Sequence, residues 1–548
     1  MDCTFNKAFI KPLLYIVATA SVLGALLLPW IGFNFLIFGQ PVHFHSLKNF
    51  SGFLLILLGS WALIPSQRVP VTAWMERIDH WADQHPEAAP WLIAGVSSLL
   101  LVNVKLFQHF SLQTHAYELG IFANICWNTL HGQFLYDSVK GGSYLGDHFQ
   151  PILALLAPAL WLWNNAAVLL VIQSIGIGLA VPPLFWLTQK ISRSGSLAVG
   201  LCLLYLSGPF LNAMSVFDFH PEVLAIPLFL WGLWFLETGR PRIFLATCLL
   251  ALSLKEDVPI ALTALGAVLV FQKPENKKIG LTLVILSAAA FVAETQIIIP
   301  HYLQNGPSVH FDRYSHLGES YEMILVNTIF DPRRIARGIF LPVGKWLNVL
   351  KYLISFGFLP LFSFGRFLPA LASLFPHLSS RYAGQYSLSG QYTALSYPFS
   401  LWASASSLKR FSKKKTFLLA GFLILSGMAL VTNSRYGHPP DWKRVGSFFE
   451  LIKEIPPEAT VRAQSDLLPH VCLRRTARIF APYKFYRFLP LFEETREKTD
   501  YVLLDIQGNT WPMNRPLFES RHSCLESKGR YRLLKSVQGF ELWQRVTP

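Results

Sequence analysis

Apolar runs of bilayer length, separated by short turns that carry lysine and arginine, recur from one end of the chain to the other. The first run, residues 13–37, is long enough to cross the hydrocarbon core of a membrane, which takes about 20 residues. Because the run continues past residues 18–20, which imitate a signal-peptide cleavage site, we interpret it as a retained helix. The composition supports this interpretation, since 14% of the residues are charged and soluble domains carry about 25%.

The basic residues predict the orientation of these helices, because lysine and arginine gather in cytoplasmic turns. Lys7 and Lys11 place the N-terminus in the cytoplasm, and Lys409 and Arg410 mark a late turn on the same side. The sequence therefore predicts an α-helical polytopic protein of the cell inner (plasma) membrane, with about thirteen transmembrane helices and an extracytoplasmic C-terminus. The net charge of +15 lies largely in these turns, so we expect no nucleic-acid partner.

The hydropathy pattern divides the chain into three parts. Residues 1–90 are predicted to form a transmembrane hairpin and a cytoplasmic loop, and residues 91–431 a transmembrane bundle with large outer loops. Residues 432–548 lack a run of membrane length and are predicted to form a small extracytoplasmic α/β domain. Apolar spacing there predicts a helix at 442–455, and β-rich runs predict strands at 460–463, 478–480, 501–505, 531–536 and 540–545.

Four polar clusters fall at the outer ends of the apolar runs in this topology. Ionisable groups close to a membrane are costly, so each cluster is a candidate site, and we expect the four to line one outward-facing cavity. The clusters contain Glu118; Asp147 and His148; Asp218, His220 and Glu222; and Lys255, Glu256 and Asp257.

Each cluster also has an ordinary structural interpretation. Glu118 fits a solvated loop, Asp147 fits the cap of the following helix, and residues 255–257 fit an internally neutralised group. The functional alternatives are a general base or metal ligand at Glu118, a metal or phosphate site at Asp147 and His148, and a phosphate contact at Lys255. No phosphate-binding loop, GxSxG, HExxH or dinucleotide fingerprint stands in a meaningful position, which argues against ATP hydrolysis and hydride transfer.

The stretches "ELGIF…WN…HG…DHFQPIL", "FDFHPE" and "LKEDV" resemble the prokaryotic membrane-protein family called domain of unknown function 2079, from residue 102 to the end of the chain. That family is similar in layout to the GT-C glycosyltransferases, which use polyprenyl-phosphate sugars and carry a catalytic carboxylate in the first large outer loop. The resemblance implies a GT-C-like fold and places catalysis on Glu118, where family members usually have aspartate. Asp147, His148, Asp218, His220 and Glu222 match the family pattern.

The resemblance and the clusters together lead to one main hypothesis: a transferase that moves a sugar from a polyprenyl-phosphate donor, borne by the membrane lipid, to an extracytoplasmic acceptor. Glu118, Asp147 and Asp218 are its catalytic candidates. A divalent metal ion is left open as a cofactor, without assigned ligands. The alternatives are a transporter or flippase of lipid-linked intermediates and a non-catalytic assembly protein. The substrate-binding candidates are His148, His220, Glu222, Lys255, Glu256 and Asp257.

Overall fold

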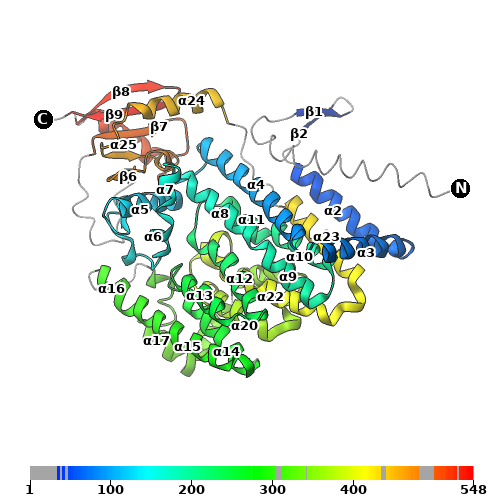
Figure 1. Ribbon diagram of the computed structural model, residues 1–548. Helices are drawn as coiled ribbons and strands as arrows, with labels where there is room; N and C mark the ends of the chain where they lie inside the picture. The colour runs from blue at the N-terminus through cyan, green and yellow to red at the C-terminus, as the bar shows by residue number, and fades with distance from the viewer. Residues whose placement is uncertain are drawn as a thin grey trace.

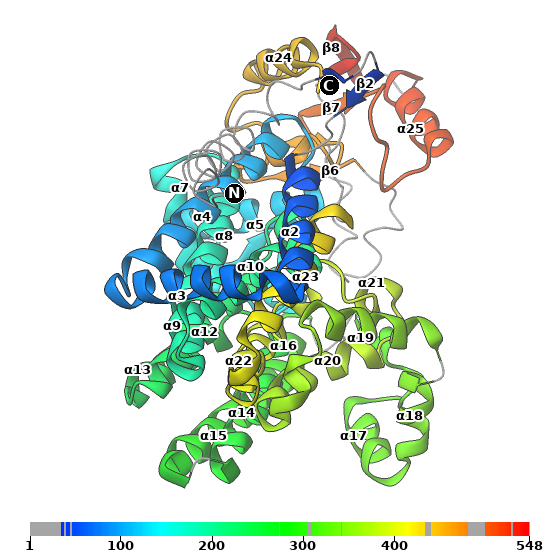
Figure 2. The same cartoon turned by 90° about the vertical axis from the view of Figure 1, so that its right-hand side faces the viewer.

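The computed structural model describes residues 34–37, 40–43, 47–272, 274–303, 310–340, 342–432, 440–480, 499–527 and 530–546. Within them, a large bundle of helices lies below a sheet formed near the C-terminus (Figures 1 and 2). The first predicted crossing, residues 13–37, falls mostly outside the described residues. Its end differs from the prediction, because Asn34–Ile37 (β1) pairs in antiparallel fashion with Gln40–His43 (β2) instead of continuing a helix.

Four helical segments of the described chain are long and apolar enough to cross a membrane. A fifth arises if two helices bent by 48° are counted as one span, and this bend falls where Pro209 interrupts the backbone hydrogen bonds. The count of about thirteen crossings stays a prediction. The segments are Ala88–Phe110 (α4), Ala167–Ser192 (α8 and α9), Lys277–Tyr302 (α15 to α16) and Leu359–Ser379 (η8 and α20), and the bent pair is Gly195–Ser207 (α10) with Pro209–Val216 (α11).

Shorter helices complete the bundle. Helices α14 and α15 pack closely. A Cβ atom added at Gly266 would lie 2.7 Å from the backbone carbonyl oxygen of Gly280, so the absence of a side chain at Gly266 allows this packing. The helices are Leu47–Leu63 (α2), Arg68–Gln84 (α3), Ala225–Glu237 (α12), Pro241–Leu252 (α13), Val258–Gln272 (α14), Tyr321–Phe330 (α17), Pro332–Phe340 (α18), Val343–Ser355 (α19), Ala383–Tyr386 (α21), Tyr397–Ser407 (α22) and Lys415–Thr432 (α23).

The first outer loop folds into short elements. The apolar stretch 149–163 forms two helices of about one turn each, because Pro158 interrupts it. The elements are Ala116–Gly120 (η2), Ile121–Leu130 (α5), Tyr136–Asp137 (β3), Gly142–Ser143 (β4), Tyr144–Gly146 (η3), Ile152–Leu156 (α6) and Ala159–Leu162 (α7).

Five strands near the C-terminus form a mixed sheet in the order β6-β5-β7-β9-β8. The pairs β5–β6 and β5–β7 are parallel, while β7–β9 and β8–β9 are antiparallel. The strand positions agree with the sequence prediction within one residue at each end. The strands are Val461–Ala463 (β5), Ala477–Ile479 (β6), Tyr501–Asp505 (β7), Tyr531–Val537 (β8) and Phe540–Arg545 (β9), and the helices beside them are Trp442–Leu451 (α24) and Arg515–Ser527 (α25).

The sheet and the first outer loop share one hydrophobic core. Leu119 and Leu153 from the loop are buried in the same cluster as Val461 and Leu468. The Nδ2 atom of Asn124 donates hydrogen bonds to the backbone carbonyls of Cys472 and Arg474, at 2.8 and 2.9 Å. The loop that carries the candidate residues is therefore held by the C-terminal sheet.

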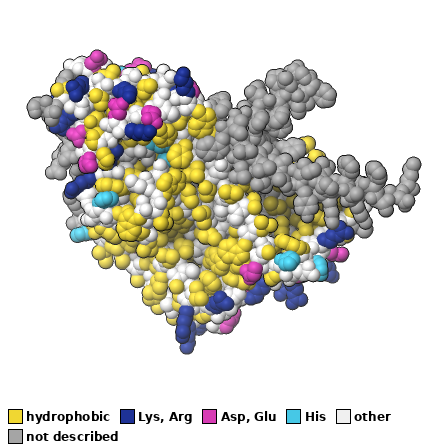
Figure 3. All heavy atoms as spheres, turned by 45° about the horizontal axis from the view of Figure 1, so that its top comes forward, with side chains coloured by type: hydrophobic (Ala, Val, Ile, Leu, Met, Phe, Trp, Pro, Cys, Tyr) yellow, Lys and Arg dark blue, Asp and Glu magenta, His cyan; other side chains and the backbone are white. Residues whose placement is uncertain are grey.

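Apolar side chains cover the middle of the molecular surface, below the C-terminal sheet, whereas charged side chains gather over that sheet and along the opposite rim (Figure 3). Many large apolar side chains of the helices are exposed, among them Leu99, Ile285 and Ile297. Such a belt is stable only in contact with lipid, which agrees with a bundle embedded in a membrane.

Candidate functional site

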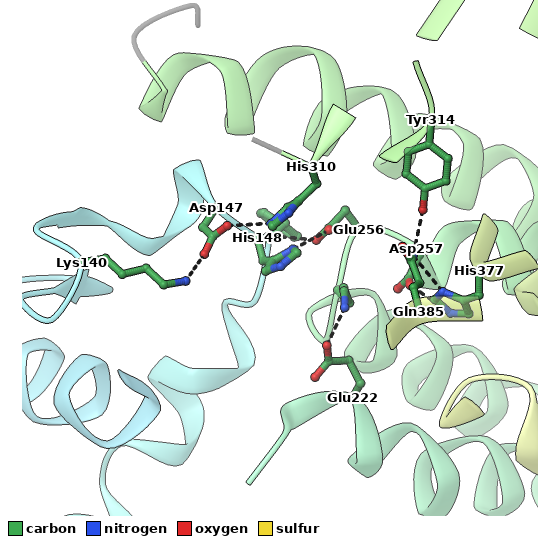
Figure 4. A network of polar contacts seen from close by, with 12 residues as sticks. Lys140, Asp147, His148, Glu222, Glu256, Asp257, His310, Tyr314, His377 and Gln385 are labelled. Atoms are coloured by element: carbon green, nitrogen blue, oxygen red, sulfur yellow. Dashed lines mark hydrogen bonds and ion pairs between the residues drawn. The ribbon is translucent and has the colours of Figure 1, made fainter. Parts of the chain in front are cut away.

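The four polar clusters singled out from the sequence come together around the link between α13 and α14, and Figure 4 shows most of their members. Ion pairs connect the first cluster to the third, the third to the fourth, and the fourth to the second. The connecting pairs are Glu118 with His220, His115 with Asp218, Glu222 with Lys255, and Glu256 with His148.

Glu118 lies in the turn η2 with an unusual backbone conformation. Its φ of +100° and ψ of −92° fall in a region that favours glycine, at a cost on the order of 1–3 kcal/mol for other residues. The surrounding chain imposes this geometry, since the N–H of Ala116 donates to the carbonyl of Ser465 at 2.7 Å and α5 begins at Ile121. The side chain of Glu118 stays 29% exposed, which places its carboxylate at the mouth of the cluster.

His220 is the buried partner of Glu118. Its Nε2 atom lies 2.7 Å from Oε2 of Glu118, and its side chain is 3% exposed. Its Nδ1 atom donates to the carbonyl of Asp218 at 3.1 Å, and its backbone N–H donates to Gln173 at 2.7 Å. Burial lowers the pKa of His220, but the charges of Glu118 and Glu222 and the hydrogen bonds to Glu118 and Asp218 together outweigh burial and raise that pKa above its ordinary value. The pair is therefore an imidazolium facing a carboxylate.

Asp218 joins the third cluster to the loop of the first. Its Oδ2 atom accepts hydrogen bonds from the backbone N–H of His115 at 2.8 Å and from Nδ1 of the same residue at 3.3 Å. Because His115 begins the turn that presents Glu118, these bonds fix where Glu118 lies. In this geometry Asp218 is a positioning residue for Glu118.

Asp147 is buried and carries partners on both oxygens. Lys140 pairs with Oδ2, and Nε2 of His310 donates to Oδ1 at 2.8 Å. Burial favours a raised pKa for Asp147, but the charges of Lys140 and His148 and the interaction with His310 together outweigh burial and hold the pKa well below its usual range. Asp147 therefore stays an ion-paired carboxylate and is poorly suited to accept a proton.

The second and fourth clusters join through His148. Its Nδ1 atom donates to Oε1 of Glu256 at 2.7 Å, and the other oxygen of Glu256 accepts from the N–H of Phe149 at 3.1 Å. Burial favours a raised pKa for Glu256, yet the charges of His148 and Lys255 and the hydrogen bonds to the carboxylate together outweigh burial and lower that pKa to about 2. His148 and Glu256 consequently form a charged pair.

Lys255 and Glu222 form a second buried pair, with Nζ of Lys255 donating to Oε1 of Glu222 at 2.7 Å. Burial favours a lowered pKa for Lys255, but the charges of Glu222, Asp257 and Glu256 and the hydrogen bond to Glu222 together outweigh burial and raise that pKa well above its usual value. Burial raises the pKa of the neighbouring Asp257 to about 6. Its Oδ2 atom lies 4.0 Å from Nε2 of His377, at the end of α20.

The buried phenol of Tyr144 lies near acids of all four clusters. Burial raises its pKa well above its ordinary value, and the negative charges of Asp147, Glu222, Glu118 and Glu256 act in the same direction. Because one hydroxyl is affected by acids from all four clusters, the clusters belong to one electrostatic unit.

Several members of this unit were missed from the sequence. Lys140, His310 and His377 sit in segments whose other residues gave no functional signal, and Arg313 stands among ordinary loop residues. Gln385, from the third outer loop, donates to the hydroxyl of Tyr314 at 2.8 Å and lies 3.1 Å from Nδ1 of His377. A histidine or arginine in an outer loop shows a role only once the fold brings it to the acids.

The arrangement has two chemical capabilities. A partly exposed carboxylate, Glu118, can accept a proton at the mouth, and the nearby cations can stabilise a phosphate. The donor set that suits a metal ion is Asp147, His148 and His310, each of which offers one ligand atom within 4.8 Å of the others.

The fold and the site define a multi-pass membrane protein with one ionisable cluster gathered beneath its C-terminal sheet. The sequence model of the family described as predicted membrane proteins, domain of unknown function 2079, matches residues 108–542. The chain belongs to this family.

Comparison with solved structures gives two crystal structures of ArnT from Cupriavidus metallidurans. The form bound to undecaprenyl phosphate is 12% identical, with a TM-score of 0.46, and the apo form is 11% identical, with a TM-score of 0.44. Each comparison covers 84% of this chain and 98% of the other. No curated protein matches the sequence.

Proposed function

We propose that this protein is a GT-C-like membrane glycosyltransferase, which moves a sugar from a polyprenyl-phosphate donor to an acceptor outside the cytoplasm. The observation that carries the proposal is that an apolar groove between membrane helices ends at the ionisable cluster. A lipid-linked sugar is a molecule that needs both surfaces at once, because its chain is apolar and its phosphate is charged.

The groove runs between α14 and α20 and has a volume of about 690 Å³. It is lined almost entirely by apolar side chains. At one end lies Gln272. The other end, at Ile260 and Phe375, is within three residues of Asp257 and two of His377, which meet at the edge of the ionisable cluster. A chain in the groove would therefore place its headgroup at the cluster. Further lining residues are Ala264, Ala267, Val268, Leu368 and Leu371.

Two cations at this end suit a phosphate. The guanidinium of Arg313 lies over the ring of Tyr382, at 4.9 Å, and no carboxylate of the described chain forms an ion pair with it. Lys255 is held by Glu222, close to Asp257. Arginine binds phosphate through several N–H groups and lysine acts as a point charge, so the two can share the charge of a leaving phosphate.

Glu118 is the proposed base. Its carboxylate takes the proton from the acceptor hydroxyl as that oxygen forms a bond to the anomeric carbon of the sugar. The bond from this carbon to the phosphate oxygen breaks, and the polyprenyl phosphate leaves with the electron pair. Asp147 is the weaker candidate because both of its oxygens are occupied by Lys140 and His310. Imidazolium at His220 would release its pairing with Glu118 as the carboxylate gains the proton.

The domain boundaries and the orientation predicted from the sequence complete the proposal. The cluster and the C-terminal domain, residues 432–548, would face outside, and the N-terminus would face the cytoplasm. A reporter that is active only outside the cytoplasm should work after Val431 and fail after Lys278. The opposite pattern would overturn the orientation.

The groove can be tested by identifying the lipid that copurifies with the protein. Mass spectrometry of extracted lipids should detect a polyprenyl phosphate, with or without its sugar, in wild-type protein. Ala264→Trp, which fills the groove, should lose this lipid and the transfer of labelled sugar from polyprenyl-linked donors. Leu281→Trp, at an exposed position of α15 outside the groove, is the matched control and should keep both. Wild-type protein that carries only bulk phospholipid and transfers no sugar would contradict the proposal.

A further inference from the structure

Three side chains with metal-ligand chemistry meet beside the ion-paired network (Figure 4). Asp147 and His148 follow η3 in the first outer loop, and His310 precedes the turn Phe311–Arg313 (η7), more than 160 residues further along the chain. We propose that Asp147, His148 and His310 bind a Zn²⁺ ion. This site stands independently of the proposed transferase, because ion binding is measured on the resting protein.

The spacing of the three side chains suits one ion. Nε2 of His310 lies 2.8 Å from Oδ1 of Asp147, and the rings of His148 and His310 are stacked, with centroids 4.6 Å apart and planes 11° apart. One ligand atom from each side chain lies within 4.8 Å of the other two. Ligand atoms bound to zinc at about 2.1 Å are at most about 4.2 Å apart, so small side-chain rotations close the set around an ion.

His148 and Asp147 already make second contacts of the kind that orient metal ligands. Histidine ligands usually donate their second ring nitrogen to a carboxylate, which fixes the ring and its tautomer. Nδ1 of His148 does this with Glu256 at 2.7 Å, so Nε2 is the nitrogen assigned to the ion once it has lost its proton. Asp147 keeps Oδ2 on Lys140, so Oδ1 is the oxygen assigned to the ion. His148 and Asp147 are therefore each oriented by a second contact.

The donor set indicates the kind of ion. Two imidazoles and one carboxylate suit zinc, whereas magnesium and calcium prefer oxygen ligands. On binding, the ion would take the place of the proton that Nε2 of His310 shares with Asp147 and of the proton on Nε2 of His148, and both protons would leave to solvent. Three protein ligands leave a fourth tetrahedral position, which a water molecule or a phosphate oxygen can fill.

The test uses the full-length protein in detergent, treated with EDTA and then dialysed against Zn²⁺. Bound zinc is measured by inductively coupled plasma mass spectrometry. Wild type should bind one zinc per chain more than His310→Ala and His148→Ala, and His131→Ala, an exposed histidine of the same outer loop, should match wild type. Glu256→Gln should weaken zinc binding about 10- to 100-fold without abolishing it, because it removes the partner that orients His148.

Each variant is first checked for a single symmetric peak in size-exclusion chromatography, and His310→Asn replaces His310→Ala if the latter aggregates. Equal zinc content in wild type, His148→Ala and the His310 variant would overturn the site. Zinc binding without sugar transfer would contradict only the proposed transferase, and sugar transfer with no zinc bound would contradict only the metal site.

Discussion

The two sides of the ionisable cluster keep their carboxylates in different states. On the Glu118 side, defined by Glu118, His220 and Asp218, one carboxylate is partly exposed and held on a strained backbone. On the Asp147 side, defined by Asp147, His148 and Glu256 with the pair Glu222–Lys255, every carboxylate is ion-paired, and those of Asp147 and Glu222 are buried.

This difference distinguishes a carboxylate that can react from carboxylates that stabilise the structure. A buried acid with an adjacent cation is held ionised and is costly to protonate, so such an acid fixes geometry or holds an ion. An exposed acid with a single imidazolium partner can exchange that partner for a substrate proton. The strained backbone of Glu118 fits the role of an acid that accepts a substrate proton. A backbone conformation of high energy persists only where the surrounding fold enforces it. The following predictions test this division, from the largest expected effect to the smallest.

The largest effect is expected from Glu118→Gln, which keeps the shape of the side chain and removes its basicity. Loss of a general base typically costs about 10²- to 10⁴-fold in rate. We therefore expect transfer of labelled sugar to fall by that factor, while the amount of protein in the membrane stays near wild type. Glu450→Gln, at an exposed position of α24, is the control. Full activity in Glu118→Gln would place the base elsewhere.

On the Asp147 side the main effect should be on stability. Glu222→Gln leaves the ammonium of Lys255 buried without its carboxylate, and breaking a buried pair costs about 3 kcal/mol or more. The double variant Glu222→Gln with Lys255→Met removes both charges and should recover most of this loss. Thermal denaturation in detergent measures both. If Glu222→Gln were as stable as wild type, the pair Glu222–Lys255 would contribute little to the free energy of unfolding. The distinction between the two sides would then be wrong.

The sequence predicts the secondary-structure elements and the candidate site to different extents. The strands at 501–505 and 540–545 were placed correctly because β-rich runs bounded by turn residues carry a local signal. The four clusters were also visible, since charges between apolar runs are rare and costly. Helix α25 was not predicted, because its few buried residues, Phe518 and Leu525, give little apolar periodicity.

The parts that the sequence could not supply depend on contacts between distant segments. The pairing of Asp147 with His310 joins residues 163 positions apart, and no local pattern marks His310. The strained backbone of Glu118 arises from the hydrogen bond between Ala116 and Ser465, near the other end of the chain. The shared core of the first outer loop and the C-terminal sheet is likewise a tertiary feature.

The strain at Glu118 predicts a reversed preference between alanine and glycine. At a helical position such as Glu450, glycine is less stable than alanine by about 1 kcal/mol. At φ +100° the order should reverse, so Glu118→Gly should be more stable than Glu118→Ala by about 1 kcal/mol. Both variants lose the carboxylate and should lack transfer activity. Thermal midpoints of the two pairs, Gly against Ala at 118 and at 450, measure the reversal, and the same order at both positions would contradict the strain.

The smallest effect concerns Asp466, which lies at the edge of the Glu118 side and contributes to stability with the opposite sign from the paired acids. Burial raises the pKa of Asp466 to about 6, the positive charge of His115 opposes this, and Asp505 and Asp218 add to it. An unfolded aspartate has a pKa of about 3.9. The folded state therefore binds more protons between these values, and stability falls as the pH rises from about 4 to 6. Asp466→Asn removes this penalty.

We expect Asp466→Asn to match wild type at pH 4 and to exceed it at pH 7 by about 1 kcal/mol, a value reduced for partial exposure of the side chain. Denaturation curves across this range measure the difference, with the exposed Asp312→Asn as control. A difference that stayed constant with pH would mean that the pKa of Asp466 is the same in the folded and the unfolded state. The contrast between the two sides would then be confined to Glu118 itself, and only an advantage of wild type over Asp466→Asn that grew as the pH rose would make Asp466 resemble the paired acids of the Asp147 side.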